Sequence, residues 1–407
     1  MSPPAKRLVR TLYVYTFLDE FVLLYPVYAL LFTDTGLSVA ETSSLFVIWS
    51  LTGLVLEVPS GAWADAVSRR LLLLVGPVLA ATGFALWVIF PSYWVFALGF
   101  VLWGTRDALT SGAMEALVYE ELDRTGETSR YAHVMGRATS VGVAADAAAI
   151  AVAIPVFAVG GYPAVGAASV LACLLTAATA LAFREHRSPS PAAEAGDEAD
   201  ERSYGQVLKA GLAEARGNPQ VLRGLVLVAV LTAVWGALEE YVPFLGTETG
   251  VAEKAIPLVV LLVWVGATAG GLLAGRARRL RARGFGAVLA VAAAALAGGA
   301  LSGHPAGFVL IAAAFGMFQM ADVVADARLQ DSITGPSRAT VTSVAGLGTS
   351  LITLAVYVFY GAAAGHLSHG VVFALLSVPY LLVAVWVATG RRTDGTRSSQ
   401  LDNRAVR

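Results

Sequence analysis

Apolar runs of about twenty residues recur along the whole chain, separated by short polar breaks. A helix of that length crosses the hydrocarbon layer of a membrane, and the sequence contains twelve such runs. They cover residues 8–32, 42–64, 71–90, 93–117, 134–159, 163–183, 222–245, 256–275, 285–301, 306–327, 341–364 and 371–388. Of the 407 residues, 57% are hydrophobic and 14% are charged, an excess that a soluble core does not need. The sequence therefore predicts an all-α membrane protein with twelve transmembrane helices.

Lysine and arginine residues fall almost entirely in alternate polar breaks. Of the 28 such residues, only Lys254 lies in the opposite set of breaks and only Arg106 lies at mid-membrane depth. Cytoplasmic loops of membrane proteins collect these residues, so the pattern predicts an orientation. We expect a multi-pass protein of the cytoplasmic membrane whose N- and C-termini both lie in the cytoplasm.

Short stretches of the first half return in the second half at a nearly constant offset. TDTG at residues 33–36 returns as TETG at 247–250, an offset of 214, and TSR at 128–130 returns as PSR at 336–338, an offset of 208. RRL after the second span also returns after the eighth. The repeat predicts two pseudo-symmetric six-helix bundles, residues 1–183 and 222–390, as in secondary transporters that bind a substrate between the halves.

Residues 184–221 join the halves and begin with a stretch rich in Ala, Pro, Ser and acidic residues, which predicts a flexible cytoplasmic linker. Apolar side chains recur on one helical face within residues 204–216. They predict a short amphipathic helix, either on the inner membrane surface or packed on protein. Residues 391–407 are expected to form a cytoplasmic tail.

The eighth span contains four glycines, at positions 266, 270, 271 and 275. They are four or five residues apart, except for the adjacent pair 270 and 271. Small residues allow helix backbones to approach closely in a membrane. We expect them to pack against the small-residue face of the fifth span.

The break after the second span reads GAWADAVSRR at residues 61–70. It resembles the signature loop of the major facilitator superfamily, with Gly61, Asp65, Arg69 and Arg70 at motif positions and with Ala66 and Ser68 where the family has a basic residue and a glycine. SGAMEALVYEEL at 111–122 and SRATVTSVAGLG at 337–348 resemble stretches of the drug-exporter-like branches. The antiporter motif of the fifth span is absent from the sequence.

This resemblance implies a transporter that alternates access to a central site between its halves. It also implies a cytoplasmic gate, formed by Gly61, Asp65, Arg69 and Arg70 together with acids at the end of the fourth span. In the family the motif aspartate faces the N-terminal end of the eleventh span and the motif arginines meet those acids. The candidates here are Glu120, Glu121 or Asp123.

Charged residues inside the spans are selectively placed. A charge at the bilayer centre costs about 2.5–3.5 kcal/mol, so such side chains face a partner or a water-filled cavity. Spans 3, 6, 9 and 12 contain none, whereas spans 1, 4, 7 and 10, which surround the cavity in the superfamily, contain several. Five residues at similar depth form the predicted proton-coupling site: Asp19, Glu20, Arg106, Asp107 and Asp146.

Two interpretations of this cluster stay open. In the first, one carboxylate, with Glu20 or Asp107 as first choices, binds and releases a proton while Arg106 sets its affinity. In the second, Arg106 is permanently paired with Asp19 or Asp146 and only holds the helices together.

Other polar and aromatic residues on the inner spans are candidates for lining the cavity: Tyr25, Tyr28, Trp103, Glu115, Trp235, Glu239, Glu240, Gln319 and Asp322. The aromatic rings either contact an amphipathic substrate or pack the helices. Glu239 and Glu240 lie near the outer end of the seventh span. They recognise a cationic substrate, close an outer gate, or form a solvated helix end.

The sequence contains no cluster typical of a metal site and no phosphate-binding loop, and its spans contain no histidine. We therefore expect a secondary active transporter without enzymatic activity or cofactor, driven by the proton gradient. Export of a small amphipathic or drug-like molecule is favoured over proton-symport uptake of a metabolite, with a receptor or membrane enzyme as further alternatives. The expected partners are the substrate, protons and the lipid bilayer, with no nucleic acid, and the protein is expected to be a monomer.

The gate interpretation predicts that Asp65→Asn favours the state that is open to the cytoplasm. Removing the negative charge weakens attraction to the positive N-terminal end of the eleventh span. The measurement is the cytoplasmic accessibility of a cysteine placed in the cavity, which should rise; unchanged accessibility would refute the gate.

Overall fold

The computed structural model describes residues 1–186, 219–332 and 338–389, with backbone alone for residues 57–66, 219 and 338–340. The described part of the first half contains α1 (Pro3–Glu20), α2 (Tyr28–Asp34), α3 (Val39–Ala66), α4 (Arg69–Ile89), α5 (Tyr93–Arg124), η1 (Thr128–Arg130) and α6 (Tyr131–Ala180). The second half contains α8 (Pro219–Glu239), α9 (Val242–Glu248), η3 (Glu253–Ala255), α10 (Ile256–Ala277), α11 (Ala282–Leu301), α12 (Gly307–Ser332), α13 (Arg338–Ala363), α14 (His369–Leu376) and α15 (Val378–Thr389). Most of the predicted linker and the whole predicted tail lie outside the described residues, so their boundaries stay predictions.

The all-helical prediction with twelve crossing segments is confirmed. Nine helical stretches among the described residues are long and apolar enough to cross a membrane. One of them, which contains α6, holds the fifth and sixth spans, which meet at Gly161 with a φ of 58° that favours glycine. The remaining two of the twelve predicted spans, the first and the fourth, lie in α1–α2 and α5. They contain more charged residues than the other crossing segments.

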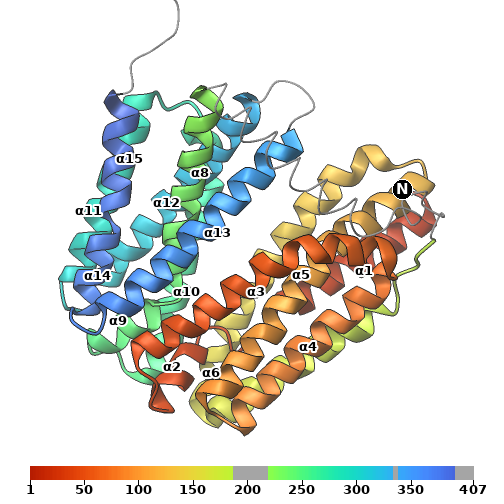
Figure 1. Ribbon diagram of the computed structural model, residues 1–407, viewed down its shortest axis with the longest axis horizontal. Helices are drawn as coiled ribbons and strands as arrows, with labels where there is room; N and C mark the ends of the chain where they lie inside the picture. Colours follow the sequence, from red (N-terminus) through yellow and green to blue (C-terminus); the bar gives the residue numbers. More distant parts are fainter. Residues whose placement is uncertain (187–218, 333–337, 390–407) are drawn as a thin grey trace, which may run out of the picture.

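Helix packing repeats between the halves. In the first half α3 packs on α5, α4 on both α5 and α6, and α1 on α6. In the second half α10 packs on α12, α11 on both α12 and α15, and α8 on α13. These are the same pairs of spans in each half, so the repeat seen in the sequence corresponds to two similarly packed bundles (Figure 1).

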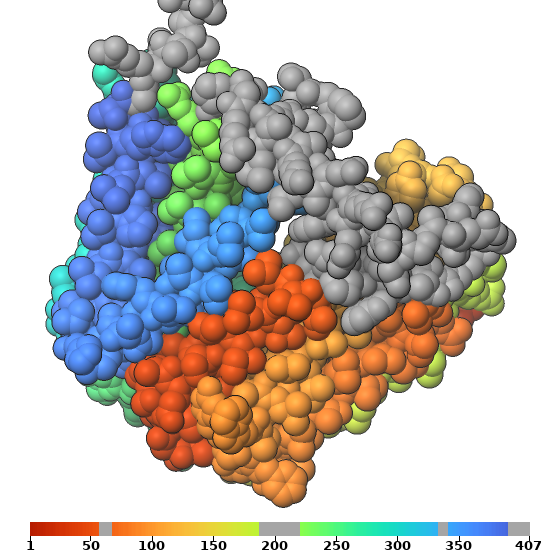
Figure 2. All heavy atoms as spheres, viewed as in Figure 1, coloured from red at the N-terminus to blue at the C-terminus, as the bar shows by residue number. Residues whose placement is uncertain are grey.

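Among the described residues, the main contacts between the two bundles are those of α2 with α9, of α3 with α13, and of α6 with α10 and η3. Figure 1 shows the bundles close together at the end that carries α2 and α9, which we call the far face, and diverging toward the end that carries the N-terminus, which we call the N-terminal face. In Figure 2 the blue α13 lies along the red-orange α3 at this junction.

The first and seventh spans are interrupted at related positions. Residues 21–27 separate α1 from α2, and residues 240–241 separate α8 from α9. The short helices that follow cover residues 28–34 and 242–248, again an offset of 214. Proline explains both breaks, since Pro26 immediately precedes the cap of α2 and Pro243 lies in the first turn of α9, where its missing N–H is tolerated.

The glycines of α10 have a different partner from the one expected. Gly270 packs against Gly316 of α12, where a Cβ would lie 1.8 Å from the Gly316 oxygen, and Gly266 packs in the same way against Ala312. The expectation of packing against the fifth span is therefore wrong for these two residues. The close approach between α10 and α12 leaves no room for a side chain.

We predict that Gly270→Ala destabilises the protein by about 1–3 kcal/mol, because the added methyl group must push α10 and α12 apart. Gly275→Ala is the matched control on the same helix, since nothing lies within 4 Å of its would-be Cβ. Thermal unfolding in detergent measures both. Equal midpoints for the two variants would contradict the packing.

Candidate functional site

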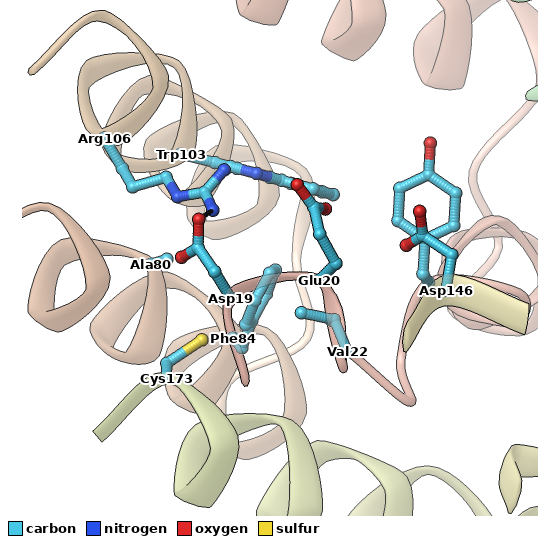
Figure 3. A pocket seen from close by; sticks show the side chains of 10 residues that line it. Asp19, Glu20, Val22, Ala80, Phe84, Trp103, Arg106, Asp146 and Cys173 are labelled. Carbon is cyan, nitrogen blue, oxygen red and sulfur yellow. Dashed lines mark ion pairs between the residues drawn. The ribbon is translucent and has the colours of Figure 1, made fainter. Parts of the chain in front are cut away.

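Arg106 lies at the centre of the charged cluster, on α5, with its side chain 13% exposed. Its guanidinium forms an ion pair with Asp19 in the last turn of α1, and the two groups point at each other in Figure 3. Arg106 Nη1 also lies 2.6 Å from Asp107 Oδ1, and Trp49 Nε1 donates a hydrogen bond of 3.2 Å to Asp107 Oδ2. A buried charge needs several such partners to offset its lost hydration. Arg106 therefore connects α1 and α5, and Asp107 extends the connection to α3.

Glu20 and Asp146 complete the cluster in a different way. Neither carboxylate forms a hydrogen bond or an ion pair with another residue in the described part of the chain. Both line the small cavity around Arg106 and also a second cavity between α1, α5 and α6. Gly142, one turn before Asp146, brings the helices close here, because its would-be Cβ lies 3.3 Å from Glu20 Cγ. The two acids thus stand between the paired arginine and the second cavity.

The two cavities differ in size. The cavity around Arg106 has a volume of about 30 Å³, enough for one or two water molecules. The second cavity has about 290 Å³ and is lined partly by Thr16, Met114 and Met135. In this conformation the arginine is reachable by water or a proton, whereas only the larger space admits an organic group.

The predicted aromatic residues have separate roles. Tyr28 is 2% exposed and packs among aromatic rings, with ring centroids 5.5 Å from Phe32 and 5.9 Å from Trp87. Trp103 and Tyr25 also line the Arg106 cavity, where their centroids are 6.0 Å apart. Packing thus accounts for Tyr28, while Trp103 and Tyr25 border the charged cluster.

Glu240 joins the two halves at the far face. It accepts a hydrogen bond from Tyr28 and one of 3.5 Å from Tyr25, and it is 7% exposed. One residue further, the Tyr241 hydroxyl donates a hydrogen bond of 2.8 Å to Ser43 Oγ across the same junction. The interpretation of Glu240 as a solvated helix end is therefore wrong. Its contacts are those of a closure between the halves.

Two polar groups of the second half, Trp235 Nε1 and Gln319 Oε1, are buried without a hydrogen-bond partner among the described residues. Glu239 and Trp264 are also buried there and interact with each other through their side chains. Asp322 is different, since its Oδ1 accepts a hydrogen bond of 2.6 Å from Thr232 on α8. Trp235 follows Thr232 by three residues and Gln319 precedes Asp322 by three, so they fall on neighbouring turns of the contacting helices α8 and α12. Buried polar groups require a hydrogen-bond partner, so the strip of α8 and α12 that contains Trp235 and Gln319 is a candidate surface for substrate binding. Glu115, by contrast, is exposed on α5.

The predicted gate is partly visible. Arg69 forms an ion pair with Glu120, whereas Asp123 accepts a hydrogen bond of 2.9 Å from Thr128. Arg70 contributes its backbone N–H, which donates a 3.3 Å hydrogen bond to Glu185. The side chains of Gly61 and Asp65 lie outside those that the structure describes, so their roles stay predictions.

Glu185 was not expected from the sequence. Its carboxylate accepts hydrogen bonds from Ser68 Oγ and from the backbone N–H of Arg69, at 3.0 Å, at the start of α4. An acid at a helix N-terminus satisfies free N–H groups and the helix dipole. Glu185 lies 116 residues after Arg69 in the sequence, so no local sequence pattern predicts this contact.

Residues 11–321 match the family model of the Major Facilitator Superfamily. Among solved structures, the chain is similar to a D-xylose-proton symporter, with 16% sequence identity, coverage of 95% of this chain and 97% of that chain, and a TM-score of 0.68. It is also similar to a bacterial homologue of the human lysosomal transporter Spinster, in an inward-facing and unoccupied conformation, with 16% identity, 95% coverage of both chains and a TM-score of 0.66. A nucleoside transporter matches at 12% identity, 95% and 98% coverage and a TM-score of 0.68. No curated protein sequence matches the chain. At these identities the structures support the fold alone.

We predict that Arg106→Met destabilises the protein by about 3–5 kcal/mol, because Asp19 and Asp107 lose their buried counter-charge. Arg137→Met on α6 is the control, since Arg137 is exposed and its substitution is expected to change stability by less than about 0.5 kcal/mol. Denaturant or thermal unfolding in detergent compares the two. An Arg106 variant as stable as the control would show that the cluster does not hold the helices together.

Proposed function

Since this chain belongs to the major facilitator superfamily, we propose that it is a secondary active transporter that exports a small amphipathic molecule across the cytoplasmic membrane in exchange for protons. The observation that carries the proposal is the pair of unpartnered carboxylates, Glu20 and Asp146, placed between the paired Arg106 and the larger cavity.

The arrangement of the halves supports alternating access. Glu240 and Tyr241 bind residues of the first half at the far face, while the bundles diverge toward the N-terminal face (Figure 1). With the termini in the cytoplasm, as the basic residues predict, this state is closed to the outside. Opening the outside requires these hydrogen bonds to break and the two bundles to approach each other at the N-terminal face.

Proton coupling follows from the difference between the acids. Asp19 and Asp107 both form ion pairs with Arg106, whose single positive charge offsets part of their combined negative charge. Glu20 and Asp146 have no such partner and face the cavity, so closing the cavity over them favours the protonated form. In the proposed cycle they take up protons when the cavity faces the outside and release them, as it faces the cytoplasm, in competition with the substrate.

The substrate surface is proposed to involve both halves. Glu20 and Asp146 supply negative charge on one side, and the strip containing Trp235 and Gln319 supplies unpaired polar groups on the other. An amphipathic molecule with hydrogen-bonding groups suits such a surface.

Export rests on the resemblance of residues 111–122 and 337–348 to drug-exporter-like branches. Uptake by proton symport is the second candidate function. It is favoured by the likeness in fold to a D-xylose-proton symporter, which couples protons to sugar transport.

Reconstitution in liposomes distinguishes these functions. The purified protein is given an imposed pH gradient of either direction and a panel of amphipathic cations, neutral drugs, sugars and nucleosides. Exchange predicts substrate accumulation on the more acidic side, whereas symport predicts accumulation on the opposite side. No gradient-dependent flux of any compound would contradict both.

We predict that Glu20→Gln and Asp146→Asn each abolish accumulation driven by the pH gradient while leaving exchange of labelled for unlabelled substrate measurable. Glu115→Gln removes an exposed acid from α5 and is expected to leave accumulation unchanged. Gradient-driven transport that survives in both variants would show that the proton is carried elsewhere.

A further inference from the structure

A basic pocket lies at the N-terminal face of the first half, where α1 begins, α5 ends and the chain leaves α6. It has a volume of about 150 Å³, and three arginines line it, Arg7, Arg124 and Arg184. They come from three segments that are distant in the sequence, so the fold brings these charges together. The pocket is separate from the cavities that contain Glu20.

One of these arginines is neutralised by an acid in the same pocket. Arg124 Nε and Nη2 donate hydrogen bonds of 3.2 and 3.0 Å to Glu121 Oε2, and the backbone N–H of His186 donates one of 3.0 Å to Glu121 Oε1. Glu121 lies beyond residue 117, where the predicted span ends. Burial alone would raise the pKa of Glu121, but the hydrogen bonds from His186 and Arg124 lower it, so the carboxylate is ionised at neutral pH.

Two positive charges therefore remain in excess. Arg7 and Arg184 are exposed and form no ion pair or hydrogen bond with another residue of the described segments. Solvated arginines are common on protein surfaces. Here, however, the two guanidinium-bearing side chains line the same pocket as Leu8 and Phe183, which are 8% and 2% exposed. An anion in this pocket would gain charge-assisted hydrogen bonds next to an apolar floor.

An exposed apolar strip leads to the pocket along α6. Leu171, Leu174 and Leu175 are 57%, 47% and 45% exposed, and the exposed face continues at helical spacing through Ala178. Ala182 is exposed in the turn that follows the end of α6. Ala182 itself lines the pocket. In a membrane protein such a strip faces lipid chains, so the pocket lies where a lipid's headgroup would meet the surface.

We propose that this pocket binds the phosphate group of an anionic membrane lipid, with Arg7 and Arg184 as its charged contacts and the acyl chains along the leucine strip of α6. The bound headgroup would hold residues 184–186, which connect α6 to the linker and include Glu185, the acid that caps α4. Lipid bound there stabilises the N-terminal face of the first half.

Native mass spectrometry of the full chain, titrated with phosphatidylglycerol or phosphatidylcholine, tests the proposal. Phosphatidylglycerol is expected to bind more tightly than phosphatidylcholine. Near a membrane surface each basic residue contributes about a fivefold factor in affinity, so Arg7→Gln with Arg184→Gln should weaken phosphatidylglycerol binding about thirtyfold. Excess inorganic phosphate should not displace the lipid.

The control removes the same charge elsewhere, by Arg10→Gln with Arg283→Gln, both exposed residues that do not line the pocket. It should retain tight binding, as should Arg7→Lys with Arg184→Lys, and the thermal unfolding midpoints show whether each variant is folded. Equal affinity for the two lipids, or equal loss in the control, would overturn the proposal. Displacement by inorganic phosphate would overturn the lipid assignment and indicate a soluble phosphate as the occupant.

Discussion

The hydrocarbon interior of a membrane offers no water to a peptide group, so each crossing segment must satisfy its own backbone hydrogen bonds. Long helices meet this requirement, and the interruptions at residues 21–27 and 240–241 occur only where protein surrounds the chain. Leu24, for example, is 1% exposed, and its N–H donates a hydrogen bond of 2.9 Å to Ser169 Oγ. The two breaks place Tyr28 and Glu240 at the junction of the halves, where they close the far face.

The same apolar surroundings organise the charges. Arg106 is stable there because Asp19 and Asp107 surround it, and these contacts tie helices of the first half together. Once those two acids are engaged, Glu20 and Asp146 remain as the carboxylates of this cluster that face open space. Under the proposed function, the acids that hold the helices together differ from the acids that bind protons, so the two interpretations raised by the sequence do not exclude each other.

Regularities of the sequence predicted the fold well. The offset of 214 between TDTG and TETG returned in the structure as two short helices at the same offset, 28–34 and 242–248. Predictions that required a partner were less successful. The glycines at 266 and 270 pack on α12 instead of the fifth span. Of the three interpretations of Glu240, its burial between the halves rules out the solvated helix end. In each case the residue's own position was correctly placed along its span, but the neighbour belongs to a distant segment.

Hydropathy and repetition are properties of the chain read in order, and they were enough to specify an all-helical chain with two similarly packed bundles. Which groups meet depended on helix rotation and on the approach of segments more than a hundred residues apart. Three juxtapositions of distant segments illustrate this: Glu185 with the start of α4, Glu240 with Tyr28, and Arg7 with Arg184 in the lining of one pocket. The sequence shows how far along a helix each side chain lies. Which residue it contacts depends on the direction in which it points from the helix axis and on which helix faces it there, and both are decided by helix packing.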